Sequence, residues 1–231
     1  MTHIKIITFP GINREKDMAD AFERNGAKRP QFIWHKDTDV GKADLIVLPG
    51  GFSYGDYLRC GAMAAHSPIM RDVLDKARKG TPVFAVCNGF QMLVETGLLP
   101  GALLRNNSLK FICKNVFLKT EHTDKGNFTQ KLNINQPIRV PIAHGEGNYF
   151  TDADGLKALN DNAQIAFRYC DETGAINDAA NPNGSINNIA GLYSRDRKIL
   201  GMMPHPENAT DILSGGTDGN ALFEGILNAL Q

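Results

Sequence analysis

Two features of the sequence predict an α/β fold built on a doubly wound, mostly parallel sheet flanked by helices. Fully apolar runs such as Leu45–Leu48 and Val83–Val86 are typical of strands buried on both faces, and amphipathic helical stretches separate them. From Asn115 onward the expected strands are shorter and separated by polar turns, which indicates an antiparallel section. The 231 residues show no internal repeat and no linker-like stretch, so residues 1–231 are expected to form one domain.

The first half of the chain alternates strands with helices. A helix is expected from Arg14 to Asn25, where apolar residues share one face and Gly26 ends the pattern. A second helix begins at Ser67-Pro68, with serine as the N-cap and proline at the first position, and a third covers Phe90–Glu95. The strands expected in this half are Ile4–Phe9, Gln31–Trp34, Leu45–Leu48 and Val83–Val86.

The second half is richer in strands. A short helix is expected at Asp154–Leu159, and a capped helix begins near Thr217 and carries apolar residues along one face. The stretch Asp171–Asn188 is rich in Asn, Ala and Gly, which predicts a loop. The expected strands are Asn115–Lys119, Phe128–Asn133, Ile138–Ile142, Ile165–Tyr169, Ile189–Tyr193 and Ile199–Met203.

The charge and cysteine content exclude several classes of protein. Lys+Arg and Asp+Glu are equal at 25 each, so no general field attracts nucleic acid or an anionic membrane. No stretch approaches the ~18 apolar residues of a transmembrane helix, and the first residues are too polar for a signal peptide. The four cysteines form no C-x-x-C pair. Reduced thiols in a cytoplasmic protein are therefore expected, without a disulfide framework or a zinc site.

The stretch Val83–Gly89 reads V-F-A-V-C-N-G and is followed at once by a helix-compatible segment. This pattern predicts a strand, a sharp turn and a helix with Cys87 at the apex, as in a nucleophile elbow. Backbone N–H groups and the helix dipole at that place are expected to lower the pKa of the thiol and favour the nucleophilic thiolate. The alternative is that Cys87 is a small buried residue that merely ends a core strand.

A thiolate nucleophile needs a base, and the sequence offers His205. It follows the expected strand Ile199–Met203, at the carboxyl end where open α/β sheets place their active sites. Glu207 lies two residues further on, and alternate residues of an extended segment point the same way. The flanking prolines favour that geometry, so the carboxylate can fix the imidazole tautomer. The alternative is a proline-stiffened loop with a solvated histidine and a helix-capping glutamate.

An oxyanion hole needs two N–H donors near the thiol. Asn88, next to the nucleophile, supplies one, and the glycine-rich turn Pro49–Phe52 after a neighbouring strand can supply the other through Gly51. The alternative is that Pro49–Phe52 is an ordinary glycine-rich turn. It is not a phosphate-binding loop, because it lacks both G-x-x-x-x-G-K-[ST] and G-x-G-x-x-G.

A second polar loop, Pro141–Tyr149, is expected to line a site or a partner surface, with a plain surface turn as the alternative. It contains His144. No tight H-x-x-x-H or H-E-x-x-H spacing joins the histidines of the chain, so no metal site is expected.

Taken together, these stretches resemble the class I (triad-type) glutamine amidotransferases over essentially the whole chain, which implies their flavodoxin-like fold. More narrowly, three segments are similar to the glutaminase subunits of phosphoribosylformylglycinamidine (FGAM) synthases, namely Gly50–Ala62, Cys87–Gln91 and Ala143–Gly147. The chain departs from the family pattern at Ala85, where the elbow usually has glycine, and a methyl group there is expected to crowd the turn slightly. It also departs around Asn13, where relatives carry serine and cysteine.

The resemblance implies an amide hydrolase with a Cys-His-Glu triad. In that family pattern Cys87 attacks the side-chain amide of glutamine, His205 shuttles protons and Glu207 orients the imidazole. Gly51 and Asn88 form the oxyanion hole, a glutamyl thioester forms, ammonia leaves, and water releases glutamate. The positions that match substrate-binding residues of the family are Phe52, Gln91, His144 and Gly145.

The resemblance also implies partners. The ammonia passes through a tunnel to a synthetase subunit that uses ATP and formylglycinamide ribonucleotide in de novo purine biosynthesis, and a small accessory subunit is a further candidate partner. ATP and magnesium are expected on the synthetase subunit, and no cofactor or metal is expected in this chain. Neither nucleic acid nor a membrane is an expected partner.

Two other functions stay open from the residues alone. One is a stand-alone Cys-His-Glu hydrolase of peptides or γ-glutamyl compounds, which would turn over substrate without a synthetase. The other is a non-catalytic regulatory protein, against which the intact Cys87, His205 and Glu207 argue.

Overall fold

A long mixed sheet runs through the part of the chain that the computed structural model describes, residues 2–124 and 127–231. Its strands are β1 (Ile4–Thr8), β2 (Gln31–Trp34), β3 (Leu45–Leu48), β4 (Val83–Val86), β6 (Ile112–Thr120), β7 (Ile138–His144), β9 (Ile165–Cys170), β10 (Ile189–Tyr193) and β11 (Ile199–Met202). They lie in the order β2-β1-β3-β4-β11-β10-β9-β6-β7. Two short strands, β5 (Ala102–Leu104) and β8 (Asn148–Phe150), pair separately.

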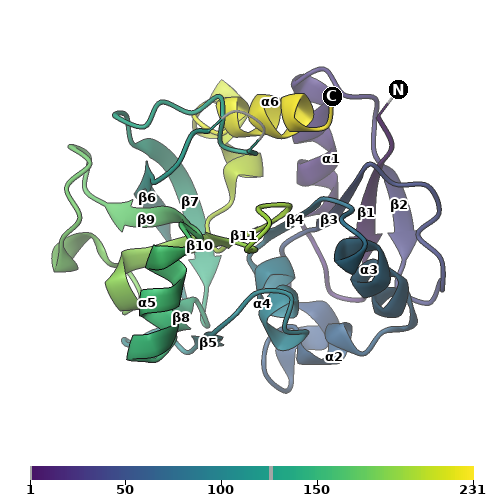
Figure 1. The fold of residues 1–231 in the computed structure, drawn as a ribbon, viewed down its shortest axis with the longest axis horizontal. Coiled ribbons are helices and arrows are strands. Elements are labelled where there is room, and N and C mark those ends of the chain that lie inside the picture. The colour runs from purple at the N-terminus through teal and green to yellow at the C-terminus, as the bar shows by residue number, and fades with distance from the viewer. Residues whose placement is uncertain (1, 125–126) are drawn as a thin grey trace.

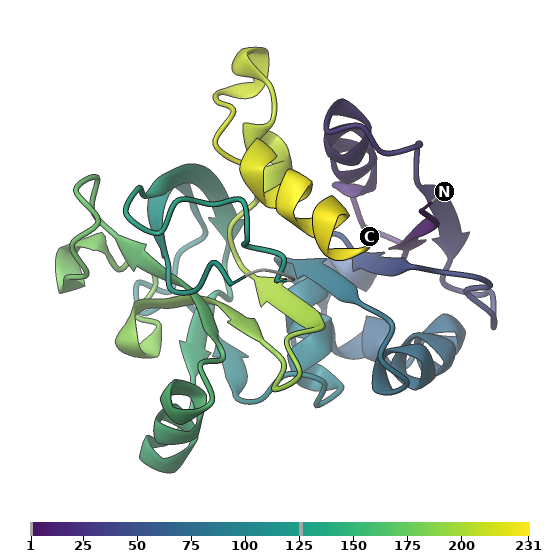
Figure 2. The same cartoon turned by 45° about the horizontal axis from the view of Figure 1, so that its top comes forward.

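Helices flank the sheet. They are α1 (Glu15–Arg24), α2 (Ala62–Ala65), α3 (Pro68–Arg78), α4 (Asn88–Glu95), α5 (Ala153–Asp161) and α6 (Asn220–Ala229). Figure 1 shows α1 and α6 on one face and α2, α3 and α4 on the other. The turned view in Figure 2 shows α6 lying across the sheet. Helices α1 and α6 contact each other through Phe22 and Phe223, whose ring centroids are 4.9 Å apart in an edge-to-face arrangement.

The predicted fold class is confirmed. Strands β2, β1, β3, β4 and β11 are parallel, and the remaining ladders from β11 to β7 are antiparallel. All residues of β3 and β4 are buried, as their unbroken apolar runs predict. Ser67 stands at the N-cap of α3, but its hydroxyl lies 2.9 Å from the Tyr54 hydroxyl instead of capping the helix.

One predicted strand is wrong. Residues Phe128–Asn133 form a series of turns, with the Leu132 N–H donating to Thr129 O at 2.9 Å. Phe128 and Leu132 are both buried, and a spacing of four residues is compatible with one face of a strand as well as with successive turns, so the apolar pattern alone does not separate the two. Gly225 of α6 packs so closely here that a methyl group on it would lie 2.2 Å from Phe128 O.

The loop predicted at Pro141–Tyr149 is also partly wrong. Strand β7 continues through His144, because its last residues remain paired with β6 up to Ile112. The helix α2 and the small strands β5 and β8 were not predicted. Each has only three or four residues, too few for a periodic pattern to stand out.

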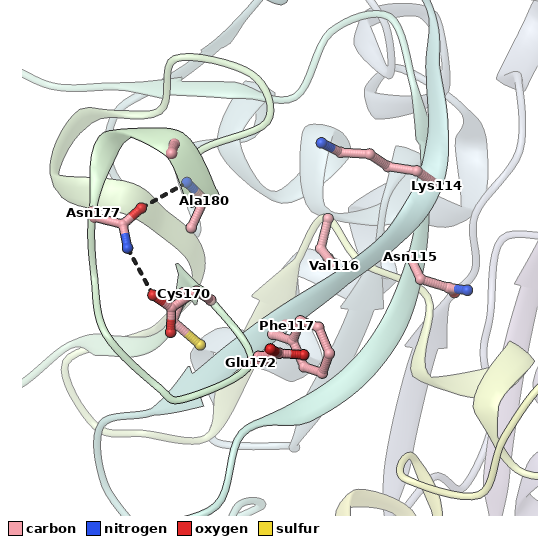
Figure 3. Close-up of a pocket in the computed structure, with 10 residues that line it drawn as sticks. Lys114, Asn115, Val116, Phe117, Cys170, Glu172, Asn177 and Ala180 are labelled. Atoms are coloured by element: carbon pink, nitrogen blue, oxygen red, sulfur yellow. Dashed lines mark hydrogen bonds between the residues drawn. The ribbon is translucent and has the colours of Figure 1, made fainter.

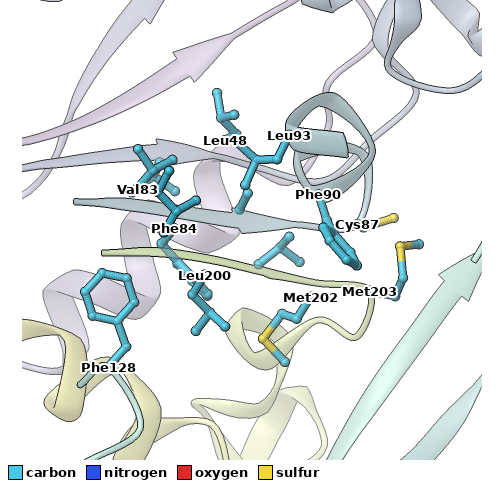
Figure 4. Packing of buried hydrophobic residues seen from close by; sticks show 14 of the residues in the cluster. Leu48, Val83, Phe84, Cys87, Phe90, Leu93, Phe128, Leu200, Met202 and Met203 are labelled. Atoms are coloured by element: carbon cyan, nitrogen blue, oxygen red, sulfur yellow. The ribbon is translucent and has the colours of Figure 1, made fainter. Parts of the chain in front are cut away.

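The sheet order fixes where functional groups can meet. Strands β4 and β11 are parallel neighbours with Val86 opposite Met202, and the Cys87 N–H donates to Met202 O at 2.8 Å. The carboxyl ends of the two strands therefore lie at the same edge. Figure 4 shows Cys87 at the end of β4, at the edge of the apolar cluster that includes Phe84, Phe90 and Leu200.

Candidate active site

Cys87 occupies a strained turn between β4 and α4. Its backbone has φ 51° and ψ −108°, a conformation that non-glycine residues adopt rarely and that concentrates at functional sites. The turn is tight because Gly89 passes directly over β3, where a methyl group on it would lie 2.0 Å from Leu48 O. The predicted elbow therefore forms. Ala85 is accommodated within β4, opposite Gly201 of β11.

His205 and Glu207 form a buried pair just beyond β11. His205 Nδ1 lies 2.7 Å from Glu207 Oε1, and both side chains are buried. The His205 N–H donates to Pro141 O at 2.8 Å, which fixes this segment against β7. Because the Glu207 carboxylate can only accept, Nδ1 carries the proton. Nε2 of His205 has no hydrogen-bond partner among the described residues, so it is the ring atom available for chemistry.

The thiol and the imidazole flank one small gap. A methyl group built on Gly50, at the end of β3, would lie 2.7 Å from His205 Cε1 and 3.3 Å from Cys87 Cβ. Cys87 Sγ itself lies 3.8 Å from Ala143 O on β7. A pocket of about 200 Å³ opens onto both side chains. Its lining residues are Asn13, Arg14, Gly51, Phe52, Cys87, Phe111, Cys113, Ala143 and His205.

The charges around His205 favour its protonated form. Burial alone lowers the pKa of His205, but the negative charges of Glu207 and Cys87, with the hydrogen bond to Glu207, raise it to about 10. A cationic imidazole beside the sulfur favours the thiolate. Glu207 thus keeps the His205 imidazole protonated at neutral pH, in the same pocket as the Cys87 sulfur.

The two predicted oxyanion donors flank the thiol. Asn88 is the first residue of α4, where a backbone N–H has no acceptor within the helix. Its side chain is buried and accepts from the Ser53 N–H at 3.1 Å, which ties the elbow to the β3 loop. Gly51 lines the pocket with φ 147°. A methyl group there would lie 2.7 Å from Ile12 Cα, so the close approach of this loop to the β1 loop requires glycine.

The predicted substrate-binding residues separate into two groups. Phe52 lines the pocket, and its ring centroid lies 6.2 Å from that of Phe111. Gln91 does not line the pocket. Its Nε2 donates to Glu146 O at 2.7 Å, and its Oε1 accepts from Asn88 Nδ2 at 2.8 Å, so both ends of the amide are held by protein.

His144 and Gly145 are likewise absent from the pocket lining. Asn106 donates through Nδ2 to His144 O at 2.9 Å, so its Oδ1, 3.0 Å from His144 Nδ1, accepts and Nδ1 carries the proton. Burial, and then the charge of His205, lower the pKa of His144 to about 4. His144 is therefore a neutral buried group that anchors the end of β7.

Several pocket residues were not predicted. Asn13 and Arg14 follow β1, and the strand-end rule that found His205 also covers this loop. Phe111 and Cys113 lie at the start of β6, an antiparallel strand whose place beside the elbow follows only from tertiary structure. All four cysteines are free thiols.

A larger pocket, about 430 Å³, lies elsewhere, between β6 and the loop after β9 (Figure 3). Cys170 lies there, but burial, and then the charge of Asp171, raise the pKa of this thiol to about 11. No histidine is among the residues that line it. In residues 2–124 and 127–231, no group of three His, Cys, Asp or Glu side chains is placed to hold a metal.

Comparison with known proteins agrees with this geometry. Residues 1–216 match the model of the CobB/CobQ-like glutamine amidotransferase domain. The chain belongs to this glutamine amidotransferase family. It is 52% identical over 230 residues to the phosphoribosylformylglycinamidine synthase subunit PurQ of Pelagibacter ubique, which covers 99% of this chain and 100% of that protein. It is also 52% identical to the PurQ subunit of Rhodospirillum rubrum, with 98% of each chain covered.

Two solved structures are similar to this fold. A chain of the Thermotoga maritima PurLQS structure superposes with a TM-score of 0.87 and 40% identity, covering 100% of this chain and 99% of that one. A proposed GMP synthase component from Thermoplasma acidophilum superposes with a TM-score of 0.67, covering 100% of this chain and 94% of that one. The two sequences are 13% identical, so this similarity shows a shared fold only. Among the described helices, none combines the length and apolar character needed to cross a membrane.

Proposed function

We propose that this chain is the glutaminase subunit of a phosphoribosylformylglycinamidine synthase. The observation that carries the proposal is that Cys87, on a strained elbow, and His205, paired with the buried Glu207, line the same pocket. Identity of about half of all residues to PurQ subunits, over nearly their whole length, supports the same conclusion.

The first half of the reaction uses the ion pair. The Cys87 thiolate attacks the side-chain carbonyl carbon of glutamine, and the developing oxyanion is held by the N–H groups of Gly51 and Asn88. The His205 imidazolium donates its Nε2 proton to the leaving nitrogen, and ammonia departs as the thioester forms. Glu207 keeps Nδ1 protonated and stabilises the cation.

The second half regenerates the thiolate. Neutral His205 accepts a proton from water through Nε2, the hydroxide attacks the thioester, and glutamate leaves. Phe52 and Phe111 form apolar walls of the pocket beside the reacting group. Gln91, His144 and Gly145 act indirectly, by holding Asn88 and the end of β7 in place.

The ammonia released from glutamine is used by a partner subunit. A synthetase subunit, holding ATP and magnesium, uses it on formylglycinamide ribonucleotide in purine biosynthesis in the cytoplasm, and a small accessory subunit completes the complex. The likeness to a chain of the PurLQS structure supports such an assembly. A stand-alone hydrolase is the second candidate, since the same triad cleaves amides without a partner, but the full-length match to PurQ subunits favours the synthase.

Reconstitution with the synthetase subunit tests the proposal. FGAM formation is measured with glutamine and, separately, with ammonium as the nitrogen source. Cys87→Ala should reduce the glutamine-driven rate at least about a thousandfold and leave the ammonium-driven rate unchanged. Cys113→Ala, which alters another thiol of the same pocket, should keep both rates. Full glutamine-driven synthesis by Cys87→Ala rules out the mechanism, and glutamine turnover that ignores the synthetase favours the stand-alone hydrolase.

A further inference from the structure

The pocket beside Cys87 has one positive side chain that the mechanism above does not use. Among its lining residues Arg14 alone has a permanently charged side chain, and no carboxylate lines the pocket. Glu207 lies behind the imidazole and is engaged by it. A ligand with a free anionic group therefore meets a guanidinium here, whose carboxylate partner, Asp17, is not among the residues that line the pocket.

The backbone of Arg14 is fixed relative to the reacting groups. Its N–H donates to Gly50 O at 3.3 Å, and Gly50 is the residue that separates the Cys87 and His205 side chains. Arg14 also stands at the N-cap of α1. The side chain therefore originates at a fixed place on the pocket wall.

The guanidinium is oriented by one carboxylate, and within residues 2–124 and 127–231 its other N–H donors make no side-chain hydrogen bond. Its Nη1 donates to Asp17 Oδ2 at 2.9 Å, and the same oxygen accepts from Asn208 Nδ2 at 3.1 Å. Asn208 directly follows Glu207. Asp17 therefore links Arg14, through hydrogen bonds, to the segment that carries His205 and Glu207. A guanidinium has five N–H donors, and the structure records one side-chain bond for this one.

Stability does not account for this arrangement. The Arg14 and Asp17 side chains are 39% and 37% exposed, and ion pairs at that exposure contribute little to folding. A guanidinium fork is, however, well matched to a carboxylate, which it binds through two parallel hydrogen bonds.

We propose that Arg14, oriented by Asp17, binds the α-carboxylate of the substrate and thereby restricts the site to free amino acids. The inference rests on the proposed glutaminase function. Glutamine presents its side-chain amide to Cys87 and its carboxylate at the other end of the molecule, toward the pocket wall. Glutamine within a peptide, or with its α-carboxylate converted to an amide, lacks the anion that Arg14 recognises.

The test compares L-glutamine with L-glutamine α-amide, using the chain in complex with its synthetase subunit. In Arg14→Met the KM for glutamine should rise about 10- to 100-fold with kcat nearly unchanged, because the lost bond is made equally in the ground and transition states. Turnover of the α-amide, which has no α-carboxylate, should be the same in Arg14→Met and in the wild type. Arg14→Lys should recover part of the affinity for glutamine.

Arg29→Met is the matched control. Arg29 also pairs with acidic residues of α1, Asp20 and Glu23, but does not line the pocket. This variant should behave as the wild type with both substrates.

Three results overturn the inference. They are an unchanged KM for glutamine in Arg14→Met, an equal loss with both substrates, and a loss explained entirely by weaker binding to the synthetase. A wild-type complex that does not hydrolyse glutamine overturns the glutaminase function, and this inference with it. A wild-type complex that is active and matched by Arg14→Met overturns this inference alone.

Discussion

His205 Nδ1 lies 2.7 Å from Glu207 Oε1, and this pair is buried at the edge of the sheet where β4 and β11 end side by side. Burying two charged groups is costly unless their remaining polar atoms are satisfied. Here both His205 Nε2 and Glu207 Oε2 lack a hydrogen-bond partner among the described residues. A buried ion pair with two unsatisfied atoms, whose imidazole shares a pocket with the thiol, is better explained by catalysis than by stability.

Removing the negative charge of Glu207 should disable the site. Glu207→Gln takes away the interaction that holds the His205 proton, so the pKa of His205 falls from about 10. We expect kcat/KM for glutamine to fall by about 10²- to 10⁴-fold, with its alkaline limb moved to lower pH. Glu224→Gln, at an exposed position of α6, is the control and should change neither. An unaltered pH profile in Glu207→Gln would contradict the assigned role.

The same charge interactions predict a loss of stability in alkali. The pKa of His205 rises from 6.5 to about 10 on folding, so between these values the folded chain binds more protons than the unfolded one. The contribution of His205 to the free energy of unfolding is therefore fully present below pH 6.5 and declines as the pH rises toward 10. Denaturant titrations at a series of pH values measure this decline. In Glu207→Gln the slope should be shallower, and an equal slope would count against the charge pair.

His144 should have the opposite effect in acid. Its pKa is lowered from 6.5 to about 4, so the unfolded chain takes up a proton first as the pH falls through this range. The contribution of His144 to stability is present above pH 6.5 and lost toward pH 4. Melting curves should show that His144→Gln is less sensitive to this change of pH than the wild type. His66→Gln, at an exposed histidine, should keep the wild-type sensitivity.

A side chain added at Gly50, between the thiol and the imidazole, should disturb their arrangement and lower activity. A methyl group at Gly50 would overlap His205 Cε1 at 2.7 Å and crowd Cys87 Cβ at 3.3 Å. Gly50→Ala should lower kcat at least about a hundredfold, since a misplacement of about 1 Å has that effect, while circular dichroism shows a folded protein. The reverse one-methyl change, Ala85→Gly in the neighbouring strand, should cost about 1 kcal/mol of stability and leave kcat intact. Wild-type kcat in Gly50→Ala would show that the two groups do not act together.

Much of this arrangement could be predicted from local sequence. The elbow at Cys87 and the segment from His205 to Glu207 each follow an apolar strand directly, and parallel neighbours bring their ends to one edge. Ala143 lies in the stretch Pro141–Tyr149, which was expected to line a site or a partner surface. Phe111 and Cys113 could not be found in this way, because they enter the pocket just before and within β6, whose antiparallel pairing at the far end of the sheet depends on long-range packing.

The directions in which the Gln91 and His144 side chains point could not be predicted from the sequence either. Gln91 and His144 match substrate-binding positions of the family, yet their polar atoms bond to neighbouring loops within the protein. Phe128–Asn133 has a composition compatible with a strand, but the contact with Gly225 of α6 favours turns. In each case a partner distant in the chain decides the outcome.

Covalent labelling identifies which thiol is the nucleophile. A glutamine analogue with an electrophilic ketone in place of the side-chain amide is added to the complex, and the modified residue is located by mass spectrometry. The account predicts one adduct, on Cys87, that excess L-glutamine suppresses, that is retained in Cys113→Ala and that is absent in Cys87→Ala. An adduct on Cys113 with Cys87 unmodified, in a folded and assembled protein, would contradict it.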